Sequence, residues 1–184
     1  MSEDSFVFHC APTLAGIKSG SLFTSDYRNK DEVMDSLRQL NRRLAPKGIR
    51  VLPLRFSQRK VLVYAYRPGG LARDLGRKEA REILRRAGYT AADADGSVIE
   101  LMRRLNEEEN FPHEIGLFLS YPPEDVQGFM EKGGRDCKCV GTWKVYGNEE
   151  LARRTFSRYK ACTDAYCRLF RSGGKSLEQL TVNS

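Results

Sequence analysis

The segment from residue 49 to residue 66 constrains the fold more than any other part of the sequence. Two β-prone runs, 49–56 and 60–66, are separated only by Ser57-Gln58-Arg59. A connection this short joins antiparallel strands, because parallel strands need a crossover of a dozen or more residues. Pro53 has no N–H to donate within a sheet, so we expect the first run at a sheet edge. The sequence therefore predicts an antiparallel hairpin and argues against a doubly wound parallel sheet.

Helical and β-prone segments interleave along the rest of the chain. Helices are predicted from apolar spacing and helix-end signals at residues 31–44, 71–87, 97–106, 124–132 and 149–171. Further strands are predicted at residues 6–10, 115–119 and 140–146, although the pattern of 115–119 also fits a buried helical turn. We therefore expect an α/β (mixed α+β) fold with about five strands, including one antiparallel hairpin, and about five helices.

The chain length of 184 residues suits one globular domain, 1–184, and we expect the tail from about residue 173 to be loosely held. No apolar run approaches the roughly 20 residues that a membrane-spanning helix needs. The acidic start, Met1-Ser2-Glu3-Asp4-Ser5, differs from the basic start of a secretory signal. The five cysteines, an odd number, suit a reducing compartment. We expect a cytoplasmic protein with no membrane partner.

Positive charge is concentrated in one part of the sequence. The formal net charge is +7, and residues 38–86 hold fifteen Lys and Arg against three Asp and Glu. This asymmetry is typical of proteins that bind nucleic acid or another acidic partner, and equally of a solvated basic surface. No nucleic-acid-binding motif accompanies the charge, so a small or anionic ligand ranks above nucleic acid as a partner.

His9 and Cys10 form the first candidate site. They end the predicted strand 6–10 and precede Ala11-Pro12-Thr13, where proline is typical of the first turn of a helix. The free N–H groups of such a turn would favour the Cys10 thiolate and, with Thr13 and Lys18, would hold an anion. Cys10 is therefore a candidate nucleophile, and His9, Thr13 and Lys18 are candidate ligand-binding residues. The alternative is a buried, apolar Cys10 beside an ordinary surface histidine.

His113 and Glu114 form the second candidate site. They follow Pro112, and each is a candidate general acid or base, with Cys10 as the third catalytic residue. His9, Cys10 and His113 are also candidate ligands for a metal or haem cofactor. Adjacent strand residues point to opposite faces, so His113 and Glu114 share a site only if the chain bends between them. The alternative is that Glu114 caps an element and His113 binds a backbone carbonyl.

Other patterns carry less weight. Cys137-Lys138-Cys139 is short of a zinc site, and Cys162 and Cys167 would point about 140° apart on a helix. Gly173-Gly174-Lys175-Ser176 lacks the earlier glycine of a phosphate-binding loop. The run Trp143-Lys144-Val145-Tyr146 offers an aromatic surface of the kind that more often belongs to a core.

Four segments together resemble a known family. They are His9-Cys10-Ala11-Pro12-Thr13-Leu14-Ala15-Gly16, Phe111-Pro112-His113-Glu114-Ile115-Gly116-Leu117-Phe118-Leu119, Tyr121-Pro122-Pro123-Glu124-Asp125-Val126 and Trp143-Lys144-Val145-Tyr146. In this order they resemble the domain-of-unknown-function family number 3793, found mainly in anaerobic Firmicutes, which often has glycine where this chain has Ser120. The resemblance spans nearly the whole chain and implies a cytosolic bacterial protein. It implies no activity, and it favours treating His9-Cys10 and His113-Glu114 as one site.

Three functions are compatible with these features. The first is a protein that handles a small ligand, an anion, or a metal or haem cofactor at a site formed by residues 9–13 and 113–114. The second is a cysteine-dependent transferase or hydrolase, with Cys10 as nucleophile, His113 or His9 as base and Glu114 as orienting carboxylate. The third binds nucleic acid or another acidic partner through residues 38–86. The sequence favours the first and leaves the ligand, the cofactor and the oligomeric state open.

Overall fold

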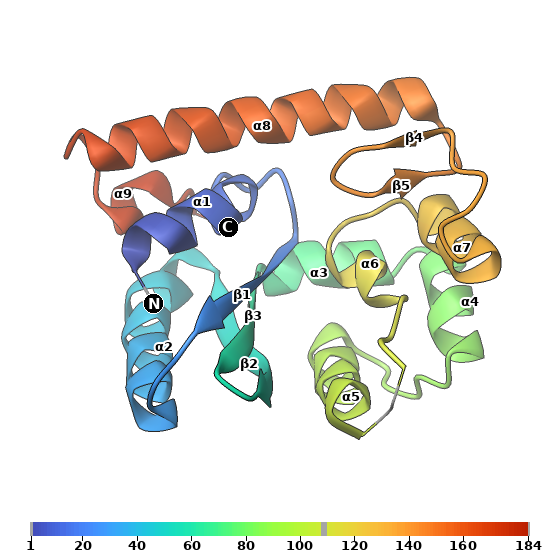
Figure 1. Ribbon diagram of the computed structural model, residues 1–184, viewed down its shortest axis with the longest axis horizontal. Helices are drawn as coiled ribbons and strands as arrows, with labels where there is room; N and C mark the ends of the chain where they lie inside the picture. Colours follow the sequence, from blue (N-terminus) through green and yellow to red (C-terminus); the bar gives the residue numbers. More distant parts are fainter. Residues whose placement is uncertain (1, 108–109, 184) are drawn as a thin grey trace. The chain divides into compact units, whose positions relative to one another are not determined.

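The computed structural model describes residues 2–107 and 110–183 and shows a mixed α+β chain (Figure 1). These described residues form nine α-helices, one 3-10 helix and five strands, which confirms the predicted fold class. The described helices outnumber the five predicted for two reasons. The predicted helix 71–87 is divided into two, and helices also form at residues 3–14, 115–118 and 177–180. Within the described residues no helix is both long and apolar enough to cross a membrane.

The chain divides into two compact units. The first runs to Gly70 and resumes at Ala161, and the second spans Leu71–Lys160. The first unit contains α1 (Glu3–Leu14), β1 (Gly20–Asp26), α2 (Lys30–Leu44), the 3-10 helix η1 (Ala45–Lys47), β2 (Arg50–Ser57), β3 (Lys60–Tyr66) and α9 (Leu177–Leu180). The second contains α4 (Lys78–Arg86), α5 (Ala94–Glu107), α6 (Ile115–Phe118), α7 (Pro123–Lys132), β4 (Cys139–Val140) and β5 (Lys144–Val145). Two helices cross the boundaries, α3 (Pro68–Leu75) and α8 (Glu149–Arg171).

A three-stranded antiparallel sheet forms the centre of the first unit (Figure 1). Its order is β1-β3-β2, which confirms the predicted hairpin of β2 and β3 and places β2 at an edge, where proline is tolerated. The register of β2 shifts between Pro53 and Arg55, at the proline that cannot donate to the ladder. The sequence analysis missed β1, which pairs with β3 from Gly20 opposite Tyr66 to Asp26 opposite Lys60.

One face of this sheet and two helices enclose the core of the first unit. Alternate residues of β3 share a face of the strand, and three of them are buried in this core: Val61, Val63 and Ala65. Helix α2 contributes the stripe that its spacing predicts: Val33, Leu37, Leu40 and Leu44. Helix α1 contributes Phe6, Val7, Cys10 and Leu14. The core of this unit is therefore built mainly from one side of α1, the stripe of α2 and alternate residues of β3.

Residues 6–10 are helical, so the strand predicted there is wrong. They lie within α1, which begins after the N-cap Ser2, whose side chain accepts a backbone hydrogen bond of 3.2 Å. Phe6, Cys10 and Leu14 follow one another at intervals of four residues, which places them on one side of a helix. Burial of that side against the core outweighs the local β propensity of the run.

In the second unit, two predicted strands take other forms. Most of the run 115–119 forms α6, the helical alternative that its pattern left open. The run 140–146 lies in a small hairpin, with β4 and β5 joined by Gly141-Thr142-Trp143. The N–H of Gly141 donates to the carbonyl of Trp143 at 3.0 Å, which closes this turn. The helices α2, α5, α7 and α8 lie where their sequence patterns predict them.

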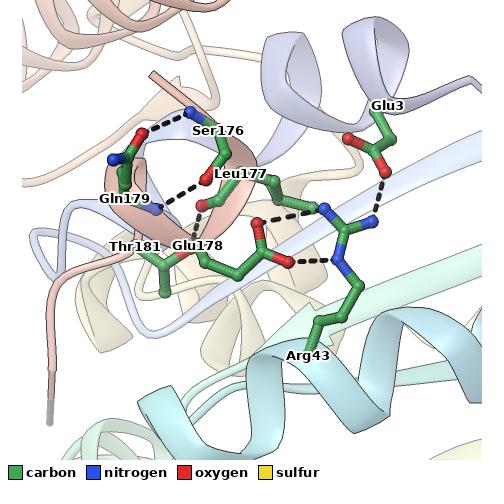
Figure 2. A network of polar contacts seen from close by, with 7 residues as sticks. All are labelled: Glu3, Arg43, Ser176, Leu177, Glu178, Gln179 and Thr181. Atoms are coloured by element: carbon green, nitrogen blue, oxygen red, sulfur yellow. Dashed lines mark hydrogen bonds and ion pairs between the residues drawn. The ribbon is translucent and has the colours of Figure 1, made fainter.

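The end of the chain packs on the first unit, whereas a loosely held tail was expected from residue 173. Helix α9 begins with a capping box, in which Ser176 and Gln179 bond each other's backbone N–H groups (Figure 2). Leu177 and Leu180 are buried in the core of this unit. The glycines at 173–174 end α8, but the two leucines beyond them supply enough apolar surface to fix the segment.

Arg43 of α2 joins α9 and α1 through two carboxylates (Figure 2). Its guanidinium donates to both carboxylate oxygens of Glu178, with Nη2 3.1 Å from Oε2, and also to Glu3. The hydrogen bond from Arg43 is the largest reason why the pKa of Glu178 falls to about 2 from the ordinary 4.5. One charged side chain thus connects three helices that are distant in sequence.

We expect Glu178→Gln to lower the free energy of unfolding at pH 7 by about 1 kcal/mol, because the carboxylate is about one-third exposed and solvent screens the pair. A carboxylate with a lowered pKa stabilises the fold fully above pH 4.5, and this contribution is lost as the pH falls toward 2. Denaturant unfolding of wild type and variant from pH 7 to pH 3 should show the difference shrinking. Glu150→Gln, which breaks an exposed ion pair with Arg154, is the control and should change little. A constant difference across this range would contradict the prediction.

Candidate functional site

The structure places His9 and Cys10 on one helix but in different surroundings. Both belong to α1, where neighbouring side chains point about 100° apart. Cys10 is fully buried in the core. His9 is exposed, and its ring stacks on Phe23 with centroids 4.9 Å apart and planes 3° apart. The two side chains therefore do not converge on one ligand.

Cys10 lacks the environment that a nucleophilic cysteine needs. It lies inside α1, and Pro12 is also inside that helix, so no free N–H groups of a helix start face the thiol. Burial raises the pKa of the Cys10 thiol well above its ordinary range, and the nearby charge of Lys18 offsets this only in part. Burial also lowers the pKa of Lys18 to about 8. The structure thus contradicts the predicted activation of Cys10 and agrees with the packing alternative.

Thr13 is hydrogen-bonded within the first unit. Its Oγ1 lies 2.8 Å from the Oγ of Ser21, and the side chain is fully buried. Its carbonyl and that of Leu14 accept hydrogen bonds from Arg67 at 2.7 and 2.8 Å. Arg67 lies in the basic region that the sequence analysis identified, but it neutralises the carbonyl end of α1 inside the protein. Thr13 therefore joins α1 to β1, and its hydroxyl is already engaged.

His113 and Glu114 precede α6 in the second unit, whereas His9 and Cys10 belong to the first. Glu114 is buried and accepts hydrogen bonds from the Tyr89 hydroxyl at 3.2 Å and from Nε of Arg104 at 3.0 Å. Burial raises the pKa of Tyr89, which keeps its hydroxyl a neutral donor. Glu114 thus anchors its segment to α5, while His113 is exposed.

The basic region of residues 38–86 is shared between the units. Nine of its basic residues belong to the first unit and six to the second. Arg43 and Arg67 are engaged with carboxylates and carbonyls of the fold. The fifteen basic residues of this region are therefore divided between the units, and two of them serve contacts inside the first.

A cavity of about 330 Å³ lies within the second unit, between α6, α7 and the β4–β5 hairpin. This is within the usual size range of small-molecule sites. Four ring-bearing side chains line it: His113, Tyr121, Phe129 and Trp143. The rest of the lining comes from Ile115, Gly116, Asp125, Val126, Val140, Gly141, Thr142 and Lys144. Rings therefore make up one third of the lining, and the cavity brings His113 together with residues from three further segments.

Asp125 holds the hairpin against α7. Its Oδ2 accepts a hydrogen bond of 2.6 Å from the indole N–H of Trp143, and its Oδ1 accepts the N–H groups of Tyr146 and Gly147, both at 2.7 Å. The carboxylate is only 3% exposed, so the three donors replace its hydration. The indole of Trp143 is consequently fixed in position and orientation.

Aromatic contacts complete the wall around Trp143. Its ring lies 4.8 Å from that of Tyr121 and 4.5 Å from that of Phe156, the latter edge-to-face. The hairpin turn passes close over Phe156, and a Cβ at Gly141 would lie 2.2 Å from that ring. Glycine is required at this position because any side chain would push the turn away from α8.

Two nitrogen-bearing side chains line the same cavity. The Nζ of Lys144 donates to the carbonyl of Gly134 at 3.0 Å and lies 5.9 Å from the centre of the Phe129 ring. The ring of His113 meets the same phenyl ring edge-to-face, with centroids 4.9 Å apart. Phe129 therefore has a cationic and an imidazole side chain as neighbours.

The described residues contain no group of three or more His, Cys, Asp or Glu placed to hold a metal ion. Of the predicted ligands, His9 and Cys10 belong to the first unit and His113 to the second. The described residues include all five cysteines and form no disulfide.

Comparison with known proteins agrees with the resemblance seen in the sequence. Residues 6–181 match the family model described as "Protein of unknown function (DUF3793)". The chain belongs to the DUF3793 family. No curated protein and no solved structure matches it.

Three of the four segments that carry the DUF3793 resemblance contribute to the cavity. They supply His113, Tyr121 and Trp143, whereas the fourth segment, which holds His9 and Cys10, lies in the first unit. Sequence reasoning noted the aromatic surface at Trp143 but assigned it to a core. It missed Phe129, a half-buried residue of α7. The only signal in the sequence is an aromatic residue within the predicted helix 124–132.

We expect Asp125→Asn to destabilise the protein by about 2 kcal/mol, because an amide cannot accept from all three donors and places its own N–H₂ among them. Trp143 is the only tryptophan of the chain, so its emission should shift to the red as the indole loses its partner. Asp136→Asn, at an exposed loop position, is the matched control. Unchanged stability and emission in Asp125→Asn would contradict the role given to Asp125.

We expect Cys10 to resist alkylation by iodoacetamide at pH 8 in the folded protein, because the thiol is enclosed and its pKa is raised. The partly exposed thiols of Cys137, Cys139 and Cys162 should react first. Peptide mass spectrometry over time, with and without denaturant, checks the order. Early modification of Cys10 in native buffer would restore the nucleophile hypothesis.

Proposed function

We propose that the protein binds a compact, flat and largely apolar small molecule in the aromatic cavity of the second unit. The observation that carries this proposal is the fixed indole of Trp143, which Asp125 and two neighbouring rings hold as one wall of a 330 Å³ cavity. Rigid aromatic walls favour planar ligands, because stacking and apolar burial both contribute to binding. The small-ligand hypothesis from the sequence is thereby kept, and its site is narrowed to the His113 segment.

Binding fits the lining better than catalysis does. The residues that line the cavity include no cysteine or serine, and the one carboxylate, Asp125, is engaged by three donors. Among the lining residues, His113 therefore has no cysteine or serine to activate and no unengaged carboxylate to orient it. Five cysteines without a disulfide among the described residues are consistent with a cytoplasmic binding protein.

N-phenyl-1-naphthylamine, a neutral aromatic dye that fluoresces in apolar surroundings, tests this proposal. We expect it to bind the wild type and to change the emission of Trp143. Phe129→Ala removes one wall and should weaken binding about tenfold, the equivalent of about 1.4 kcal/mol. Phe8→Ala is the matched control, because Phe8 is an exposed phenyl side chain of the first unit. Failure of the dye to bind, or equal loss in both variants, would reject the proposal.

A further inference from the structure

The charges of the cavity allow the ligand class to be narrowed, on the condition that the proposed function holds. Lys144 is half-buried, and of its three N–H donors one is used by the carbonyl of Gly134. Within residues 2–107 and 110–183 no carboxylate forms an ion pair with its ammonium. A half-buried ammonium with unused donors and no counter-ion is suited to binding an anion from outside.

His113 provides a second nitrogen donor at the same place. Its ring contacts Phe129 and Phe111, but neither ring nitrogen hydrogen-bonds to any part of the chain that the structure describes. Histidine carries at least one ring N–H in either protonation state. Among the described residues, no backbone carbonyl accepts a hydrogen bond from His113, which was the alternative considered in the sequence analysis.

Nothing acidic in the lining competes for these two donors. Asp125, the one carboxylate among the lining residues, already accepts from Trp143, Tyr146 and Gly147. Two further lysines of this region, Lys132 and Lys138, contact an aromatic ring and a carbonyl but no carboxylate of the described chain. Among the lining residues, the ammonium of Lys144 therefore has no acceptor other than the Gly134 carbonyl.

We propose that the ligand is an aromatic acid, whose ring lies against Trp143 and Phe129 and whose oxyanion accepts hydrogen bonds from Lys144 and His113. A carboxylate, sulfonate or phosphate satisfies this chemistry. The apolar ring accounts for the walls of the cavity, and the acidic group accounts for the two donors that the fold leaves unused.

A pair of dyes with the same ring skeleton separates the acidic group from the ring. Anilinonaphthalene-8-sulfonate carries a sulfonate on the skeleton of N-phenyl-1-naphthylamine. We expect the sulfonate to bind the wild type at least tenfold more tightly than the neutral dye. Lys144→Gln and His113→Gln should each remove most of this preference, taken as the ratio of the two dye affinities in the same variant. Glutamine keeps a donor for the Gly134 carbonyl, and His113 makes no hydrogen bond whose loss would unfold the hairpin.

Lys138→Gln is the matched control, because it removes the same charge from the same hairpin region outside the cavity lining. The sulfonate preference should survive in this variant. If all three variants lose the preference equally, the charge acts only as a general field and the inference is wrong. If the neutral dye binds the wild type as tightly as the sulfonate, the inference fails but the proposed function stands. If neither dye binds or perturbs Trp143, both fail.

Discussion

The geometry of the cavity depends on the buried carboxylate of Asp125. A hairpin with two-residue strands has too few ladder bonds to hold its own position. Asp125 supplies three hydrogen bonds from α7 to the turn and to the residues after β5, and so replaces the missing ladder. The cost of burying the charge is offset only while all three donors stay in place. The indole orientation, the Tyr121 contact and the turn over Phe156 all follow from this arrangement.

Glu114, next to the cavity-lining His113, has a comparable role. It fixes the segment before α6 to Tyr89 and Arg104, with its side chain bonded to these neighbours while the preceding His113 contacts Phe129. Glu114, a candidate catalytic residue in the sequence analysis, and Asp125 thus both hold neighbouring segments in place. The lining side chains that these anchors leave toward the cavity include a lysine and a histidine, which can donate hydrogen bonds, and the rings of Phe129 and Trp143.

The parts of the fold that could be predicted are those whose sequence pattern and burial agree. The stripe of α2 and the hairpin of β2 and β3 follow from spacing and from a three-residue connection. Residues 6–10 could not be predicted, because their β propensity is local while the core that buries Phe6 and Cys10 is assembled from distant segments. The cavity was predictable only at His113. Phe129 of α7 and Lys144 of the hairpin also line the cavity. The hydrogen bonds of Asp125 that join α7 to the hairpin leave no periodic signal in the sequence.

The first unit is discontinuous in sequence, and this has a consequence for how the chain matures. Its core includes Leu177 and Leu180, and the carbonyl of Val182 accepts a hydrogen bond of 2.8 Å from Arg67. During synthesis the ribosome completes Leu71–Lys160 before these residues emerge. The unit that holds the cavity has all its residues available first, while the core of the other unit is completed only when Leu177 and Leu180 have been made.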